Sequence, residues 1–399
     1  MKPAMTTALS AAPATDALLG VYRRPPMEFV RGAGVELFDA DGKAYLDFVA
    51  GIAVNALGYG DEGLERAMRE AIEGSLVHVS NLYRTAPGER LAEKLVERTF
   101  ADRVFFCNSG AEANEGAFKI ARRWGRTTGG SAKHEIIALR GAFHGRLFGT
   151  LAATDRPAYR APFRPLAGGI SIVERDMEEL DAALNPETVA AVIAEPVQGE
   201  GGVRVLEHEF LQALRELTRS RGIALILDEI QCGYGRTGTF LAHEQAGIEP
   251  DLLTVAKPMA GGLPMGAILA TKEIADTMQP GDHGTTFGGG PFLSHVALHV
   301  LDRLSDPAML AHVKSNGAWL KKSLNKMAGE STKIRAVRGI GYMWGIDVVD
   351  PAKDIVARAL DAGLLICSAG EHTLRLLPPL VMTREELERG LGILSTVIG

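Results

Sequence analysis

The sequence contains little cysteine, few aromatic residues and no long hydrophobic run. Only 6% of its 399 residues are Phe, Trp or Tyr, and the three cysteines Cys107, Cys232 and Cys367 lie far apart. This spacing suits neither a disulfide framework nor a zinc cluster, and it favours a reduced, cytoplasmic setting. The longest segment without Asp, Glu, Lys or Arg, 283–301, contains histidines and a glycine run, which argues against a membrane span.

An excess of positive charge is also missing. The 43 basic and 49 acidic residues give a net charge of −6, which argues against nucleic acid or an anionic membrane as the main partner. Glycine, by contrast, is abundant, with 46 residues against an average usage of about 7%. Many of these glycines lie in 199–290, where we expect the backbone to approach a ligand closely.

The order of predicted elements indicates an α/β protein. Residues 33–51 read as a hairpin, and 62–77 and 86–99 have helical periodicity. Short apolar runs then alternate with helices at 111–124, 176–184 and 208–221, which is typical of a mainly parallel sheet. The runs are Val104–Phe106, Ile136–Leu139, Val189–Ala194, Ile223–Leu227, Leu252–Ala256 and Ala267–Ala270.

The last hundred residues favour a smaller α+β domain. We expect a helix over 305–327, strands near 334–349, a helix over 351–362, a strand over 373–377 and a helix over 383–398. The predicted division is a mobile tail over 1–16, a segment over 17–58 that packs with the small domain, a large domain over 59–303 and the small domain over 304–399.

Polar residues follow several of the predicted strands, where ligands of open α/β sheets bind. Ser109 and Glu112 form a capping box, so a helix should begin there and offer N–H groups to a phosphate. Asp228 leaves one apolar strand and Lys257 leaves the next, so the two could face each other across one crevice. A partly desolvated lysine there could attack a carbonyl.

Three further segments add to this picture. Phe143 and Arg146 could stack on a planar ring and bind a carboxylate, whereas His144 alone is more often structural. Gly-rich loops at 199–202 and 281–290 leave amides exposed for an anion. The G-x-G-x-x-G sequence at 233–238 does not pass directly from strand to helix, so it does not predict a dinucleotide site. A lysine, an acid, a stacking aromatic residue and phosphate-binding amides together describe a pyridoxal 5'-phosphate site.

These motifs resemble those of class III aminotransferases of fold type I. The segments NSGAEANE, FHGR, EPVQGEGG, DEIQCGYGRTG, AKPMAGGLPMGA and HGTTFGG occur in the family's order, from about Tyr22 to the end of the chain. Within the class the chain is most similar to the acetylornithine branch. The resemblance implies a seven-stranded, mainly parallel sheet in a large domain, a small domain built from both chain termini, and a homodimer with shared active sites.

The resemblance also implies roles at the cofactor. Lys257 would form a Schiff base with the cofactor, Asp228 would pair with its ring nitrogen, Gln231 would bond its ring oxygen, and Phe143 would stack on the ring. The phosphate would be held by Ser109, Gly110 and Ala111, with Thr286 from the partner subunit.

For the substrate, the resemblance implies that Arg146 binds the α-carboxylate, with Thr285 and Tyr22 nearby. Glu200 and Arg375 would form a switch pair that accepts first a neutral ω-arm and then glutamate. The implied reaction transfers the amino group of N2-acetyl-L-ornithine to 2-oxoglutarate by a ping-pong route. It gives N-acetyl-L-glutamate 5-semialdehyde and L-glutamate, a step of arginine biosynthesis.

Two departures from the family pattern bear on the substrate. Gly290 stands where the family usually has Asn, and AKPMAGG replaces the commoner AKGLGGG. Other amino donors therefore stay open, namely succinylornithine, ornithine, 4-aminobutyrate and carrier-protein-bound ornithine or lysine. A 2,1-aminomutase activity also stays open. A non-catalytic binding protein of the same fold is a further alternative, against which Asp228 and Lys257 argue.

Overall fold

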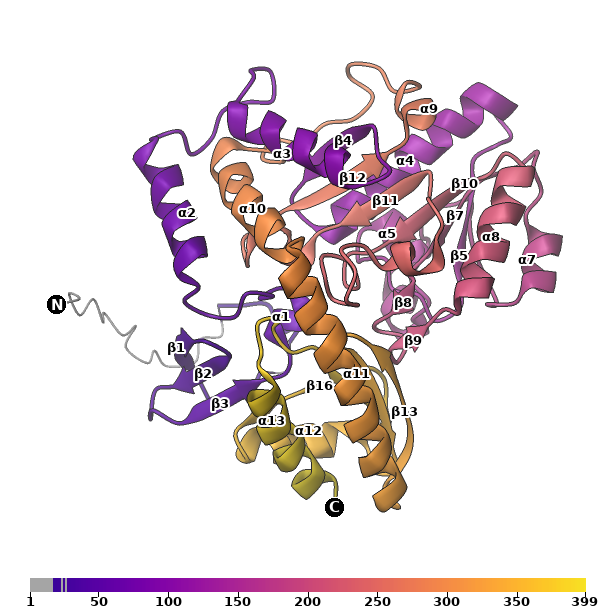
Figure 1. Cartoon of the computed structure of the whole chain (residues 1–399). Coiled ribbons are helices and arrows are strands. Elements are labelled where there is room, and N and C mark those ends of the chain that lie inside the picture. The colour runs from indigo at the N-terminus through magenta and orange to yellow at the C-terminus, as the bar shows by residue number, and fades with distance from the viewer. Residues whose placement is uncertain (1–16, 23, 26) are drawn as a thin grey trace.

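A seven-stranded sheet forms the centre of the larger lobe in the computed structural model, which describes residues 17–22, 24–25 and 27–399 (Figure 1). The predicted tail over 1–16 lies outside these residues. The strands are rich in Val, Ile, Leu and Ala, and the middle strands are buried along their whole length, as expected for a sheet covered on both faces. In spatial order they are β4 (Arg103–Cys107), β12 (Gly266–Ala270), β11 (Leu252–Val255), β10 (Ala224–Asp228), β7 (Val189–Ala194), β5 (Glu135–Leu139) and β6 (Ile170–Val173).

All neighbouring strands of this sheet are parallel except at β12, which is antiparallel to both β11 and β4. The predicted mainly parallel sheet is therefore confirmed. The short strand β6 was not predicted, because four residues at a sheet edge, three of them half-buried and one exposed, give little signal. β10 and β11 are direct neighbours, with Asp228 opposite Thr254, so the ends of the two strands that precede the predicted site lie side by side.

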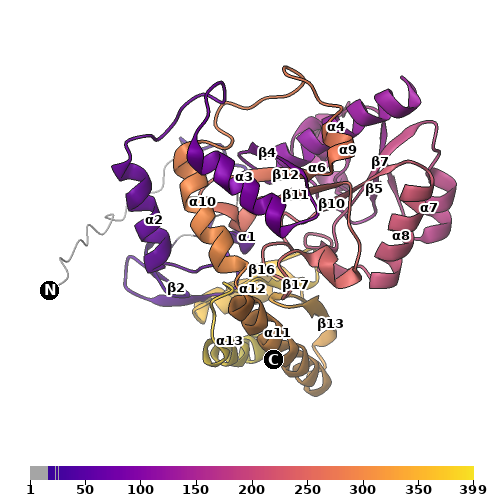
Figure 2. The same ribbon diagram turned by 45° about the horizontal axis from the view of Figure 1, so that its top comes forward.

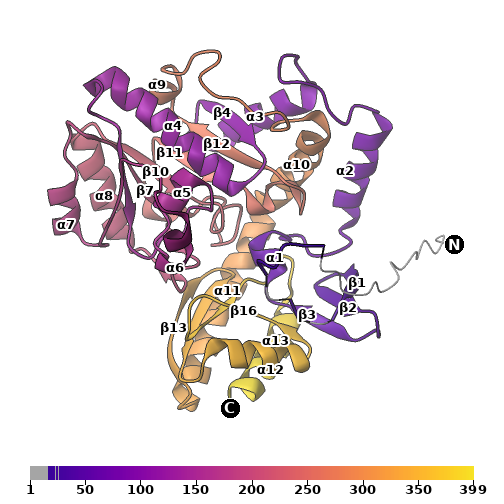
Figure 3. The same cartoon turned by 180° about the vertical axis from the view of Figure 1, so that it is seen from behind.

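Helices cover both faces of this sheet. Helix α4 (Gly110–Gly129) packs on one face against β7, β11 and β12, and lies in front of the sheet in Figure 3. Helices α3 (Ala86–Arg98) and α10 (Pro291–Leu304) cover the other face (Figure 1). Helix α10 also packs against α2 (Glu62–Glu73). The remaining helices of this lobe are α5 (Phe148–Ala152), α6 (Pro157–Arg160), α7 (Met177–Ala183), α8 (His208–Ser220) and α9 (Lys272–Ala275), and the short turn α1 is Ala50–Ala53.

Two helix predictions need correction. The helix predicted over 62–77 ends at Glu73, because Gly74 and the exposed residues after it have no core to pack on. The helix predicted over 305–327 runs from Pro307 to Glu330 as α11 and is preceded by the separate helix α10. Because α10 packs against α2, α3 and the turn at Lys257–Ala260, much of its surface is apolar and its sequence lacks a clear polar face.

The smaller lobe contains two four-stranded sheets. One joins β1 (Phe29–Ala33), β2 (Glu36–Asp39) and β3 (Ala44–Asp47) to β15 (Leu364–Leu365), so the N-terminal hairpin pairs with the C-terminal region. The predicted hairpin is confirmed, whereas the exact domain boundaries stay a prediction. The other sheet has the order β13 (Ile334–Ile340), β14 (Met343–Val348), β17 (Thr373–Leu376) and β16 (Cys367–Ser368), flanked by α11, α12 (Ala352–Asp361) and α13 (Arg384–Ile398).

The two lobes meet along α11 and the short hairpin β8 (Val197–Gln198) and β9 (Arg204–Val205), as the turned view shows (Figure 2). In the described ranges no helix is long and apolar enough to cross a membrane. Those residues also contain no group of three or more His, Cys, Asp and Glu side chains that could hold a metal ion.

Candidate active site

Asp228 is the last residue of β10, and its carboxylate is almost completely buried. One oxygen, Oδ2, accepts hydrogen bonds from Asn114 Nδ2 at 2.7 Å and from His144 Nδ1 at 2.8 Å. The other oxygen, Oδ1, accepts only the N–H of Ile230, at 3.1 Å, from among the described residues. Asp228 is thus fixed from one side and keeps acceptor capacity on the other for a further N–H donor.

A second layer holds these donors in place. Asn114 lies on the buried face of α4, and its Oδ1 accepts a hydrogen bond from Thr254 Oγ1 at 2.7 Å. This bond leaves the amide nitrogen free to donate to Asp228. His144 Nε2 is buried without a partner in the part of the chain that the structure describes. Asn114 and Thr254 were not found from the sequence, although a buried Asn on an otherwise apolar helix face is a signal that could have been used.

Glu195 is a second buried acid close to Asp228. Its Oε1 accepts the N–H of Phe143 at 2.9 Å. Burial is the main cause that raises the pKa of Glu195, His144 opposes the rise and the Asp228 carboxylate adds to it, and the net pKa is about 7. The site therefore concentrates two carboxyl groups in a poorly hydrated region, which is a common property of functional sites.

Lys257 follows β11 and begins a short turn over Lys257–Ala260. Loss of water around its amine lowers the pKa of Lys257, and Arg375 adds to this effect, while Asp228 opposes it. Within the described ranges its Nζ has no hydrogen-bond or ion-pair partner. A lysine that is easily deprotonated and unpaired has the properties of a nucleophile and a base.

Glu200 and Arg375, 175 positions apart in the sequence, form an ion pair in which Arg375 Nη2 lies 2.6 Å from Glu200 Oε1. The guanidinium of Arg375 is 2% exposed, and it also donates to Gln231 Oε1 at 3.3 Å and to Cys367 Sγ at 3.4 Å. The structure thus brings together three residues of the predicted site. Cys367 was not predicted as part of it, because its cross-strand pairing with Arg375 depends on the β16–β17 register.

The start of α4 has the form predicted for a phosphate site. Ser109 caps the helix by accepting the N–H of Glu112 at 3.3 Å, and the first-turn N–H groups of Gly110 and Ala111 have no carbonyl within the helix. The Glu112 carboxylate bonds the N–H of Asn108 at 2.8 Å, not that of Ser109, so only half of the predicted capping box forms. A Cβ at Gly110 would lie 2.8 Å from the Ile230 side chain, so this turn packs closely on the loop after Asp228.

Phe143 and Arg146 lie on the loop that carries His144. Phe143 is half-buried, and Arg146 is exposed with its guanidinium 3.6 Å from the centre of the Tyr159 ring and 5.8 Å from that of Phe143. Stacking fixes the plane of the guanidinium and leaves its edge available for a carboxylate. Tyr159 had no distinguishing signal in the sequence.

Three predicted site residues have few or no contacts with the residues described above. Thr285 Oγ1 accepts a hydrogen bond from Asn108 Nδ2 at 3.2 Å, which places it beside the start of α4. Thr286 is exposed, and Tyr22 is 75% exposed. The roles given to these three residues stay predictions.

The residues around Lys257 fit a cofactor that has an aldehyde, a ring nitrogen and a phosphate. The unpaired amine suits the aldehyde, the unfilled oxygen of Asp228 suits a protonated ring nitrogen, and the first turn of α4 suits the phosphate. This donor set and the fold together define a transferase of the pyridoxal phosphate class.

Comparison with known proteins agrees with this class. The family model described as "Aminotransferase class-III" matches residues 21–398. The chain is 44% identical over 382 residues to the mitochondrial acetylornithine aminotransferase of Alnus glutinosa, covering 94% of this chain and 84% of that protein. It therefore belongs to the class III aminotransferases, which are pyridoxal phosphate enzymes.

Solved structures give the same result. The N-acetylornithine aminotransferase of Stenotrophomonas maltophilia has a TM-score of 0.83 and 37% identity, covering 94% of this chain and 96% of that one. The ornithine aminotransferase of Toxoplasma gondii, described with partial occupancy of PLP at its active site, has a TM-score of 0.92 and 29% identity. It covers 96% of this chain and 92% of that one.

Proposed function

We propose that this aminotransferase takes the ω-amino group of N2-acetyl-L-ornithine and passes it to 2-oxoglutarate, as a step of arginine biosynthesis. The observation that carries the proposal is the Glu200–Arg375 ion pair beside Lys257 and Asp228. The acetylornithine aminotransferases among its relatives support the choice of donor.

Pyridoxal phosphate, when bound, supplies an aldehyde that accepts the amino group and a ring that delocalises the electron pair left on the substrate carbon. Ser109, Gly110 and Ala111 would hold its phosphate, Phe143 its ring face and Gln231 its ring oxygen. Asp228, fixed by Asn114 and His144, would hold the proton on the ring nitrogen.

Lys257 is the residue we assign to proton transfer. The lowered pKa of Lys257 favours the neutral amine, which would remove a proton from the substrate carbon, and its protonated form would then return that proton as an acid. We expect Lys257→Ala to abolish turnover while the protein stays folded. A rate in this variant within tenfold of the unchanged enzyme would contradict the assignment.

Arg146 and the Glu200–Arg375 pair would select the substrates. The stacked guanidinium of Arg146 suits the α-carboxylate that donor and acceptor share. While Glu200 neutralises Arg375, the site accepts the uncharged arm of the donor. For 2-oxoglutarate, its second carboxylate would replace Glu200 on Arg375. One site can then serve two substrates of different charge.

A donor panel tests this function. We expect glutamate formation from 2-oxoglutarate to have the highest kcat/KM with acetylornithine. Succinylornithine, ornithine, 4-aminobutyrate and a carrier-protein-bound ornithine should be at least about tenfold poorer. Equal or better use of another donor would replace acetylornithine in the proposal. No turnover with any donor would favour the non-catalytic alternative.

We also propose a homodimer in a cytoplasmic location. Leu82, Tyr83 and Phe287 are 86%, 70% and 59% exposed, which is unusual for large apolar side chains unless a partner covers them. Thr286, next to Phe287, would then reach the phosphate of the partner subunit. The location is supported by the three cysteines, all of which are free thiols. Light scattering of the purified enzyme tests the dimer, which a monomeric mass would exclude.

A further inference from the structure

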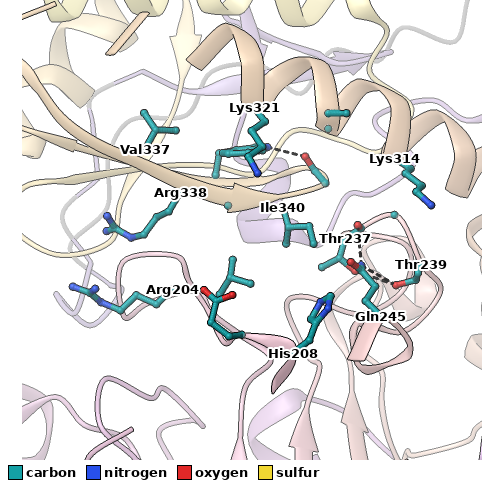
Figure 4. A pocket seen from close by; sticks show the side chains of 18 of the residues that line it. Arg204, His208, Thr237, Thr239, Gln245, Lys314, Lys321, Val337, Arg338 and Ile340 are labelled. Carbon is teal, nitrogen blue, oxygen red and sulfur yellow. Dashed lines mark hydrogen bonds between the residues drawn. The ribbon is translucent and has the colours of Figure 1, made fainter. Parts of the chain in front are cut away.

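A cavity of about 810 Å³ lies between the two lobes, apart from the residues of the proposed active site. Its large-lobe wall comes from β9, the start of α8 and the loop at 237–239, and its small-lobe wall from α11 and β13. Figure 4 shows Arg204 and Arg338 reaching from opposite walls toward the same end of this cavity, with Lys314 at the other end.

The lining of this interlobe cavity is strongly basic, although the chain as a whole has a net charge of −6. Glu207 is the one acid among the lining residues that the structure describes. The basic lining residues are Arg175, Arg204, His208, Lys314, Lys321 and Arg338.

Part of this positive charge has no ion-pair partner. Arg338 is paired with Asp347, to which Nη1 and Nη2 donate at 2.6 and 2.8 Å. In contrast, Arg175, Lys314 and Lys321 have no ion pair or hydrogen bond within the described part of the chain. Burial lowers the pKa of Arg175, repulsion from Arg204 lowers it further and Glu174 opposes the shift, so the two arginines lie close enough to repel each other.

The neutral polar side chains of the segment 237–245 are already occupied by one another and by backbone carbonyls. Gln245 Nε2 donates to Thr237 O at 3.2 Å and to Thr239 Oγ1 at 3.1 Å, and Thr239 Oγ1 donates to Leu241 O at 2.7 Å. Apart from the Asn325 amide, the donor groups that remain available to a ligand are therefore cations. We propose that the interlobe cavity binds a small polyanion that carries phosphate or carboxylate groups.

This cavity is connected to the proposed substrate switch. Two of its arginines hold the loop between β8 and β9 by the backbone, with Arg204 Nε donating to Gly201 O at 3.2 Å and Arg338 Nε to Gly202 O at 2.6 Å. The other side of the same loop carries Glu200, which pairs with Arg375. A short loop thus has the cavity on one side and the switch pair on the other.

The same loop contains a strained residue. Val203 is fully buried and has a φ of +52°, which is a costly conformation for a β-branched side chain. A polyanion that drew Arg204 and Arg338 away from the loop carbonyls would loosen this segment. Glu200 would then leave Arg375 more easily, and 2-oxoglutarate would bind more tightly.

Calorimetric titration of the holoenzyme tests the site without relying on the proposed function. Inorganic tripolyphosphate and citrate are titrated separately at constant ionic strength, which distinguishes a phosphate ligand from a carboxylate ligand. We expect saturable binding of one ligand per chain for at least one of the two. The double variant Lys314→Gln/Lys321→Gln should bind at least about tenfold more weakly.

The matched control is Lys322→Gln/Lys353→Gln, which removes the same charge from exposed residues outside the cavity. It should bind like the unchanged enzyme. Absence of saturable binding, or an equal loss of affinity in the control, would overturn the site. In steady-state rates with saturating ligand, we expect the KM for 2-oxoglutarate to fall about threefold while kcat stays the same. An unchanged KM would overturn the connection to Glu200.

Discussion

Asp228 and Glu229 are consecutive, both are buried, and each is hydrogen-bonded to the Nδ1 atom of a histidine. The distances are 2.8 Å from His144 to Asp228 and 2.7 Å from His243 to Glu229. Because successive side chains at a strand end point to opposite sides, the two pairs occupy different regions. The Asp228–His144 pair lies at the proposed active site, whereas the Glu229–His243 pair joins the two ends of the loop over 229–243.

The two carboxylates differ in how completely they are satisfied. The oxygens of Glu229 accept the N–H groups of Ala242 and His243 as well as the His243 ring, so they close the loop on itself. Asp228 has one well-bonded oxygen and one that accepts a single N–H at 3.1 Å. Burial and a histidine partner are common to both acids, so the unfilled bonding capacity of Asp228 is the difference that supports its proposed role at a ligand.

The largest expected effect is on the rate of Asp228→Ala. Without this carboxylate the ring nitrogen of the cofactor loses the group that keeps it protonated, so kcat should fall by about 10³-fold or more. The melting temperature should also fall, because Asn114 and His144 lose their shared acceptor, so kcat is compared per folded enzyme. Steady-state rates and thermal melting measure both quantities, and a loss in rate below tenfold would contradict the proposed role.

Glu229→Gln should mainly affect stability. Removing the charge leaves His243 buried beside a neutral amide, and breaking a buried ion pair costs about 3 kcal/mol of stability. We expect this loss in urea-induced unfolding, while kcat of the folded enzyme stays within about threefold. A large loss of kcat with unchanged stability would show that the two carboxylates share one function.

The next largest expected effect is the change with pH in the stability that the Glu229–His243 pair provides. Burial alone would lower the pKa of His243, but its hydrogen bond to Glu229 and nearby negative charge raise it above the usual 6.5. The Glu229–His243 ion pair therefore stabilises the folded protein fully below pH 6.5, and this contribution is lost as the pH rises through the raised pKa of His243. The difference in melting temperature between the unchanged chain and His243→Gln should narrow from pH 6 to pH 9. A constant difference would exclude the ion pair as its source.

Thr254→Val should have the smallest effect. Valine keeps the shape but removes the hydroxyl that bonds Asn114 Oδ1, so the amide can turn away from Asp228. We expect kcat to fall about fivefold and the free energy of unfolding by about 1 kcal/mol. Thr254→Ser, which keeps the hydroxyl, is the matched control and should restore the rate. Equal rates in both variants would show that the hydroxyl does not position Asp228.

Much of the sheet could be predicted from sequence, because strands buried on both faces are continuous apolar runs. The run Val189–Ala194 is β7 to the residue, and the two runs before Asp228 and Lys257 are indeed neighbours. Prediction was weaker where burial removes the pattern, as in α10, or where a strand is short, as in β6. Residue type and strand position also identified Asp228 and Lys257, whereas the pairing of Glu200 with Arg375 was expected only from the family resemblance.

The sequence by itself determined the chemistry that is available: an acid and a lysine at the ends of successive strands, a capped helix after β4 and glycine-rich loops whose backbone can approach a ligand closely. It placed Asp228 at the end of its strand, but it could not show which of the adjacent acids Asp228 and Glu229 keeps free acceptor capacity. Only the tertiary structure decided which of them is left with acceptor capacity, through Asn114, Thr254 and His243, which come from distant parts of the chain. The physical reason is that hydrogen-bond satisfaction depends on neighbours in space, whereas periodicity and capping depend on neighbours in sequence.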